Sequence, residues 1–239
     1  MKRTTMAGGG PGTKRDSKRR KARPEQGSLP FVRRGGVRKG AGRKPNGDKA
    51  GVSHRPRSRL ASRFPSHLTV RLREGLPRLR NRAAHRVLRG CFRAGNERFG
   101  FRLIHYSIQG NHLHFIAEAK DRPALARGVQ GLLIRIAKAL NKLWGRRGGV
   151  FADRYHDHVL RTPREVRHAL CYVFHNARRH GLALAGGLDA YCSGWWFDGW
   201  KETFTATDVP ERPTAEARTW LLQIGWRRHR LLRLDEVPG

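Results

Sequence analysis

The spacing of apolar residues between Ser66 and Gly181 constrains the fold more than any other feature of this sequence. Apolar residues at every second position suit a strand, and apolar residues at every third or fourth position suit a helix. The predicted elements are strands at 66–72, 99–108, 112–119 and 154–161, and helices at about 76–93, 121–143 and 162–180. The order strand, helix, strand, strand, helix, strand, with a further helix, implies an α+β fold. We expect an antiparallel sheet of four to five strands with helices packed on one face.

Local signals mark the last of these helices and one turn. Thr162 suits a helix cap, Pro163 suits the first helical position, and Glu165 follows the cap by three residues, which together predict a capping box. Gly181 is the matching helix stop. Gln109-Gly110-Asn111 joins the predicted strands 99–108 and 112–119, and its Gly-Asn pair predicts a tight hairpin turn.

The charge of the chain predicts a polyanionic partner. Its 239 residues hold 51 Lys and Arg against 18 Asp and Glu, a formal net charge of +33. Such a charge favours nucleic acid. A membrane is disfavoured, because no run of about 18 apolar residues exists to span one. Because the N-terminus lacks the apolar stretch of a signal peptide, we expect a cytoplasmic protein. The cysteines, Cys91, Cys171 and Cys192, are scattered and predict reduced thiols.

The two ends of the chain differ in composition from its middle. Residues 1–62 predict a disordered basic arm that binds DNA, since the first 60 hold 19 Lys and Arg against 3 Asp and Glu. Within this arm, residues 38–45 loosely resemble an AT-hook, a motif that binds the minor groove of DNA. The alternative is that the arm binds phosphates without sequence preference. In both cases we expect Arg43 and Lys44 to contact DNA. Residues 182–239 form a Trp-rich extension, which predicts either a helix packed back on the domain or a separate DNA-contacting tail.

His112 and His114 are the first candidate site residues. They are separated by one leucine in a predicted strand, so both imidazoles face one side while Leu113 and its neighbours pack on the other. Two converging imidazoles are a natural start to a metal site. Glu118 shares their face and either joins the metal shell or forms an ordinary salt bridge. On the last helix, Tyr172 and Asn176 are four residues apart and therefore neighbours on one face.

These stretches resemble a known family. Residues 109–116, Gln-Gly-Asn-His-Leu-His-Phe-Ile, are similar to the His-hydrophobe-His motif of the HUH single-strand nucleases. Residues 171–178, with Tyr172 followed four positions later by an amide, resemble the nucleophile helix of the one-tyrosine transposase branch. Phe151-Ala152-Asp153-Arg154-Tyr155 resembles a stretch that the family carries before its fourth strand. The resemblance covers about residues 66–181, is nearest to transposases associated with repetitive extragenic palindromes, and implies a ferredoxin-like or RRM-like HUH domain over 63–181.

The resemblance also implies a reaction and its residues. It implies that His112, His114 and Asn176 hold one divalent ion, Mg²⁺ or Mn²⁺, and that Tyr172 is the nucleophile. The implied reaction cleaves and rejoins single-stranded or hairpin DNA through a 5′-phosphotyrosine, without a nucleotide cofactor. A homodimer with exchanged tyrosine helices is left open. Two imidazoles would also suit zinc or iron. The subgroup often has Pro-Val after the amide, and this chain has Ala177-Arg178, which lets the helix continue. The arginines expected to contact DNA are Arg154, Arg161, Arg178 and Arg179.

Several alternatives compete with these assignments. Tyr155 and, more distantly, Tyr106 are rival nucleophiles, but Tyr155 lies in a predicted strand and has no amide four residues on. His156-Asp157-His158 repeats the histidine spacing with a charged middle residue, which favours a supporting or DNA-contacting role. For the whole chain, a replication or conjugation initiator is disfavoured because no phosphate-loop motif is present. A non-catalytic, domesticated nucleic-acid-binding protein is the alternative from a different class; the aromatic signature of RNA-binding domains is missing.

Overall fold

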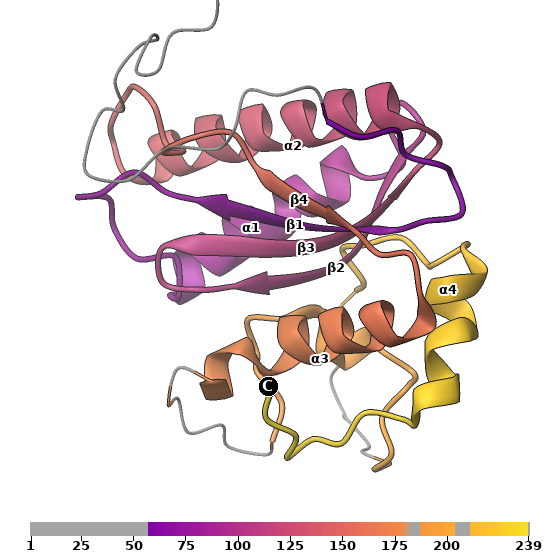
Figure 1. Cartoon of the computed structure of the whole chain (residues 1–239). Helices are drawn as coiled ribbons and strands as arrows, with labels where there is room; N and C mark the ends of the chain where they lie inside the picture. The colour runs from indigo at the N-terminus through magenta and orange to yellow at the C-terminus, as the bar shows by residue number, and fades with distance from the viewer. Residues whose placement is uncertain (1–56, 180, 182–186, 204–210, 239) are drawn as a thin grey trace, which may run out of the picture. The chain divides into compact units, whose positions relative to one another are not determined.

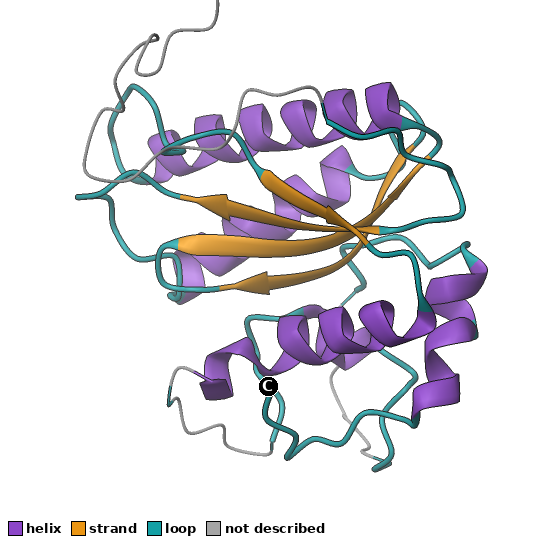
Figure 2. Cartoon of the chain, in the orientation of Figure 1, coloured by secondary structure: helices purple, strands orange, loops and turns teal. Residues whose placement is uncertain are grey.

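A computed structural model of the chain describes residues 57–179, 181, 187–203 and 211–238 (Figure 1). Most of the predicted basic arm, with Arg43 and Lys44, lies outside these residues. Figure 2 shows the distribution of helices and strands over the same view. The elements are β1 (Ser66–Arg71), α1 (Arg82–Gly95), β2 (Phe101–Ile108), β3 (His112–Ala119), α2 (Arg122–Leu143), β4 (His156–Val159), α3 (Pro163–Arg179), α4 (Trp220–Gln223) and two 3₁₀ turns, Ser193–Trp196 and Gly225–His229.

The strands form one four-stranded antiparallel sheet in the order β2-β3-β1-β4. With a helix between β1 and β2 and another between β3 and β4, this is the ferredoxin-like arrangement. The α+β class and the antiparallel sheet are therefore confirmed. β3 lies in the middle of the sheet, paired with β2 on one side and β1 on the other, so its side chains are held from both sides.

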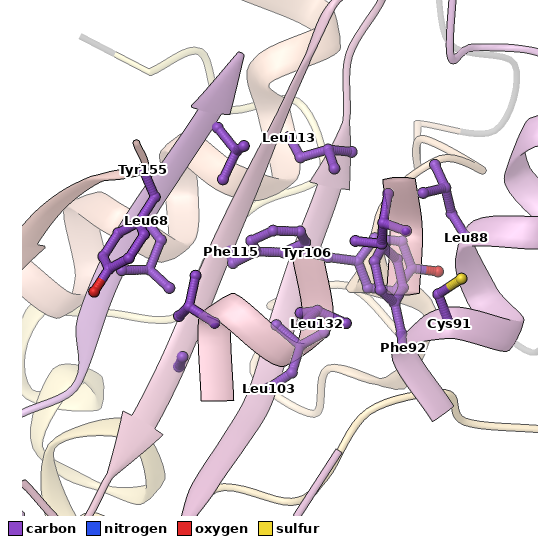
Figure 3. Close-up of a cluster of buried hydrophobic side chains, with 14 of the residues drawn as sticks. Leu68, Leu88, Cys91, Phe92, Leu103, Tyr106, Leu113, Phe115, Leu132 and Tyr155 are labelled. Carbon is purple, nitrogen blue, oxygen red and sulfur yellow. The ribbon is translucent and has the colours of Figure 1, made fainter. Parts of the chain in front are cut away.

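Helices cover both faces of the sheet, whereas the sequence predicted helices on one face. α1 and α2 lie on one face and α3 lies on the other (Figure 1). Leu68, Leu113 and Phe115 pack into the core under α1 and α2 (Figure 3). Ile104 and Ile116 pack into a second core with α3 and the C-terminal segment. Almost every residue of β2 and β3 is buried. This agrees with helices on both faces, because a strand covered on both sides does not alternate between buried and exposed residues.

α1 begins later than the sequence predicted. The expected helix starts near Leu76, but the helix begins at Arg82, and Asn81 is its N-cap, with its side-chain oxygen accepting a hydrogen bond from the Ala84 amide at 2.9 Å. Pro77 precedes the cap, and the residue before a proline avoids helical geometry. The buried residues of α1 are Ala84, Leu88, Cys91, Phe92 and Gly95.

The other two long helices begin and end close to their predicted bounds. The Glu165 amide donates to Thr162 Oγ1 at 3.2 Å, and the Glu165 carboxylate accepts from the Arg161 amide at 2.5 Å. Gly181 adopts φ 75°, which suits the predicted helix stop. Asp121 caps α2 by accepting from Ala124 at 2.7 Å. No helix in the described part of the chain is both long enough and apolar enough to cross a membrane.

The C-terminal segment packs on the domain, which is the first of the two alternatives considered for it. Trp200 and Trp226 are buried in the second core beside α3. Glu118, on β3, is 1% exposed and accepts hydrogen bonds from the Arg218 amide and from both the amide and the hydroxyl of Thr219, at 2.8–3.1 Å. It also pairs with Arg102. These partners use the lone pairs of the carboxylate, so Glu118 ties the segment to β3 and is not placed to join a metal shell.

Residues at the end of the predicted arm also contact the domain. Leu60 is buried in the core under α1 and α2. Arg57 pairs with Asp157 on β4 at 3.1 Å, and its guanidinium lies 3.7 Å from the ring centroid of Tyr155. The folded part of the chain therefore includes residues that composition alone assigned to the arm.

Candidate active site

His112 and His114 face α3, as the strand alternation predicts. In the pairing of β3 with β1, His114 lies opposite Thr69 and Leu113 lies opposite Val70. Leu113 and Phe115 point into the core on the other face. The two imidazole rings are 4.8 Å apart, centroid to centroid. His112 is partly exposed and His114 is only 3% exposed, so the pair runs from the surface into the protein.

Hydrogen bonds orient both imidazoles through Nδ1. His112 Nδ1 lies 2.9 Å from the side-chain oxygen of Asn111, and donation to that acceptor puts the ring lone pair on Nε2. His114 Nδ1 lies 3.1 Å from Thr69 Oγ1 and 3.3 Å from His67 Nε2. In the tautomer in which His114 Nδ1 donates to Thr69, its lone pair is also on Nε2. A metal-binding histidine commonly has its other ring nitrogen held in this way.

Tyr172 lies directly beside the histidines. α3 brings its ring to 5.1 Å from that of His114, with the two planes at 90°. The Arg179 guanidinium lies 5.5 Å from the centroid of the Tyr172 ring. Tyr172 is partly exposed and lines a cleft of about 610 Å³ together with His67, His158 and His168. The predicted nucleophile is therefore partly accessible and has an imidazole and a cation close to its ring.

Asn176 lies one helical turn beyond Tyr172 and is completely buried. Neither its amide oxygen nor its amide nitrogen has a hydrogen-bond partner in the described structure. Leaving a buried polar group unsatisfied costs about 1–3 kcal/mol, so such groups in proteins commonly have a ligand or a functional reason. An amide oxygen one helical turn from Tyr172, whose ring contacts His114, is a ligand type that suits a divalent ion. The expected set of His112, His114 and Asn176 is thus chemically suitable, and whether it binds metal stays a prediction.

His67 belongs to the same cluster, and the sequence reasoning missed it. It lies on β1, and its ring is 5.3 Å from that of His114 and 5.7 Å from that of Tyr172. Burial, followed by the nearby His158 and His156, lowers the pKa of His67 to about 4. The alternation of residues 66–72 placed His67 opposite the apolar face of that strand. What the sequence lacked was the pairing of β1 with β3, which makes the two histidines neighbours.

The second histidine pair faces the same side of the sheet as the first. His67 lies opposite His158, and Thr69 lies opposite His156, in the pairing of β1 with β4. Asp157, between them, is turned to the other face, where its carboxylate pairs with Arg57 and with Arg122 at 2.5 Å. The charged middle residue is therefore packed and neutralised. His158 reaches the cleft of Tyr172, which agrees with a supporting role.

The rival tyrosines lie in the core under α1 and α2 (Figure 3). Tyr106 is fully buried, and its burial raises the pKa of its phenol. Tyr155 is 9% exposed under Arg57, and burial likewise raises its pKa. Both point away from the face that carries the histidine pair. Tyr172 is the tyrosine that the structure places against His114.

The four predicted DNA-contacting arginines in the described residues differ in their surroundings. Arg154, Arg161 and Arg179 are exposed. Arg178 is partly buried, and its guanidinium donates to two backbone carbonyls, those of Leu234 at 3.1 Å and Gly187 at 3.4 Å. Arg178 therefore fastens the C-terminal segment to α3, a structural role that its sequence position beside Arg179 did not reveal.

No three His, Cys, Asp or Glu side chains among the described residues are grouped so as to hold a metal ion. The expected set differs, since it has two histidines and an amide. The sequence matches no protein-family model and no curated protein. Among solved structures, the chain is similar to a REP-associated tyrosine transposase bound to a REP hairpin, with TM-score 0.49 and 17% identity over 59% of this chain and 82% of that one. A similarity of this size establishes neither a family nor an activity for this chain.

Proposed function

We propose that this protein is a metal-dependent transposase that cleaves and rejoins single-stranded DNA, with Tyr172 as the nucleophile. One observation carries the proposal: an accessible tyrosine lies 5.1 Å, ring to ring, from one of two histidines aligned on a strand, with a buried and unpartnered amide one turn away on the same helix. The strongly basic chain supports a nucleic-acid substrate.

In this proposal His112, His114 and Asn176 hold a divalent ion. When bound, the ion would act as a Lewis acid on the scissile phosphate and stabilise the charge that develops there. The orientation of both imidazoles through Nδ1 presents Nε2 for that purpose. The rigid setting of β3 in the middle of the sheet limits the movement of these ligands.

Tyr172 performs the covalent step. Its phenolic oxygen bonds to phosphorus, the bond from phosphorus to the 3′ oxygen breaks, and the phenolic proton is transferred so that a free 3′ hydroxyl remains. Attack by another 3′ hydroxyl on the phosphotyrosine reverses the step and restores the phenol. One phosphoester replaces another each time, so no nucleotide hydrolysis is needed. The exposed Arg161 and Arg179 supply positive charge to the DNA on the α3 side.

The test is covalent capture of DNA. The full-length protein is incubated with a labelled single-stranded hairpin oligonucleotide and Mg²⁺ or Mn²⁺, and denaturing gels are used to detect a protein–DNA adduct. We expect an adduct with wild type and with the control Tyr155→Phe, and none with Tyr172→Phe. An adduct that persists in Tyr172→Phe contradicts the nucleophile assignment. Binding without an adduct in any divalent metal would instead support a non-catalytic nucleic-acid-binding protein.

A further inference from the structure

The exposed face of α1 carries a single file of arginines. They follow one another at intervals of four, three and four residues, which places them on one side of a helix. The opposite side packs into the core through Leu88 and Phe92. The helix contains no acidic residue. With His85 and Gly90 these arginines line a hollow of about 520 Å³. We name them the α1 arginine stripe: Arg82, Arg86, Arg89 and Arg93.

Nearby acidic groups neutralise little of the positive charge of the stripe. Arg82 and Arg86 are exposed and form no ion pair within the described residues. Arg93 pairs with Glu211 at 3.0 Å, but both side chains are more than half exposed, and such surface pairs contribute little. Arg89 donates to the Glu211 carbonyl at 2.8 Å and lies over the Trp196 ring, which orients it. Like charges along one helix face repel each other. A polyanion bound to the stripe would relieve that repulsion.

The geometry of the stripe suits a phosphate backbone. Arg82 and Arg93 are separated by about 16 Å along the axis, at 1.5 Å per residue. One strand of duplex DNA has about five phosphates over that length, at 3.4 Å of axial rise each. The hollow is lined by four arginines, His85 and Gly90, and by no tryptophan, tyrosine or phenylalanine of the kind on which single-strand binding sites commonly stack unpaired bases. Contacts to phosphates alone suit a duplex and are independent of sequence.

The stripe begins at the end of the sheet where the candidate active site lies. The Leu79 amide, just before α1, donates to the Gly110 carbonyl at 2.9 Å. Gly110 is in the turn that leads directly into His112. Arg82 therefore starts near the entrance to β3, and the stripe leads away from it along α1. Since α1 and the histidine pair lie on opposite faces of the sheet, a DNA segment that continues from the cleaved strand reaches the stripe by passing around this end of the sheet.

We propose that the α1 arginine stripe binds the phosphate backbone of a double-stranded segment that adjoins the single strand at Tyr172. The expectation that a single strand adjoins the duplex rests on the proposed function, whereas the duplex contact is inferred from α1 alone. The binding surface thus has two parts, one for the reacting single strand and one for the duplex.

The experiment measures binding as a function of salt. Fluorescence anisotropy of the full-length protein is recorded with a duplex and with a single strand of equal length. The variant is the triple substitution Arg82→Gln, Arg86→Gln and Arg93→Gln. Its control removes three charges from exposed positions of α2: Arg127→Gln, Lys138→Gln and Lys142→Gln. Each lost duplex contact reduces the slope of log K against log salt by about 0.9, so we expect a fall of about 2 to 3 for the α1 variant only.

A second variant distinguishes loss of DNA binding from loss of folding. Gly90→Glu places a carboxylate in the hollow, and a Cβ at Gly90 meets no atom within 4 Å. Glutamate also favours helix more than glycine does. We expect duplex affinity to fall at least tenfold with an unchanged melting temperature. Equal losses in the α1 and α2 triple variants, an unchanged slope, or a loss confined to single strands overturns the inference. Failure of wild type to form an adduct would overturn the proposed function while leaving these slopes to decide the duplex contact.

Discussion

Replacing Asn176 by leucine is predicted to stabilise the metal-free protein while abolishing adduct formation. Leucine has as many side-chain heavy atoms as asparagine, branched in the same way, so it suits the same space. Asn176 is fully buried and both of its amide atoms lack partners in the described structure. An unsatisfied buried polar group costs about 1–3 kcal/mol. Because neighbouring side chains adjust to the new methyl groups, we expect a net gain of about 1–3 kcal/mol in the free energy of unfolding.

Urea and thermal unfolding in the presence of a chelator measure this gain. For a folded region of this size, 1 kcal/mol corresponds to about 2–4 °C, so the melting temperature rises by about 2–12 °C. Adding Mn²⁺ then separates the variants, because a ligand that binds only the native state at a hundred times its Kd adds about 2.7 kcal/mol. Wild type gains that stability and Asn176→Leu does not.

Ser66→Ala is the matched control. The Ser66 hydroxyl is also buried without a partner, but it lies on the strand face that carries Leu68, away from the histidines. Its removal leaves the Mn²⁺ effect and adduct formation unchanged. The reasoning is refuted when Asn176→Leu is less stable than wild type by more than about 1 kcal/mol without metal, since a loss of that size indicates an ordinary satisfied asparagine. Equal stabilisation of wild type and Asn176→Leu by Mn²⁺ refutes the assignment of Asn176 as a metal ligand.

Three further predictions test the surroundings of the site. Burial, followed by the positive charge of Arg212, lowers the pKa of His105 to about 3, so only the unfolded state binds this proton between about pH 6.5 and pH 3. Stability falls as pH drops through that window, by about 2 kcal/mol at pH 5 from this residue, and His105→Gln flattens the profile of urea midpoints against pH. His67→Gln lowers Mn²⁺ affinity and adduct rate by about 10- to 100-fold, while His168→Gln, in the same cleft, leaves Mn²⁺ affinity unchanged in a metal titration. Glu118→Gln costs about 3–5 kcal/mol because it leaves Arg102 unpaired, and limited proteolysis detects release of the C-terminal segment; resistance equal to wild type contradicts the tether.

Local patterns predicted much of this fold. The capping box at Thr162 and the alternation that turns His112 and His114 to one face depend on residues close in sequence. The spacing of Tyr172 and Asn176 likewise placed them together on α3. Such features are recoverable because helix and strand periodicity is set by the backbone itself.

Features that depend on pairing between distant segments were not predictable. His67 joins His114 only because β1 lies beside β3, and no local pattern reports strand order. The same holds for Asp157, whose charge is neutralised by arginines from two other segments. Arg178 was expected at DNA because it is a basic residue beside the tyrosine helix, yet its guanidinium bonds two backbone carbonyls of the C-terminal segment. The covering of the second sheet face by α3 was not readable from β2 either, because Arg102, His105 and Ser107 interrupt its apolar residues, although His105 and Ser107 are buried.

Peptide mapping of the covalent adduct tests the central claim most directly. Wild-type protein is reacted with a hairpin oligonucleotide in Mn²⁺, digested with nuclease and protease, and analysed by mass spectrometry. The account predicts a nucleotide joined through a 5′ phosphate to Tyr172, and a product strand with a free 3′ hydroxyl. A nucleotide on Tyr155, Tyr106 or any other residue, or cleavage that leaves no nucleotide on the protein, contradicts it.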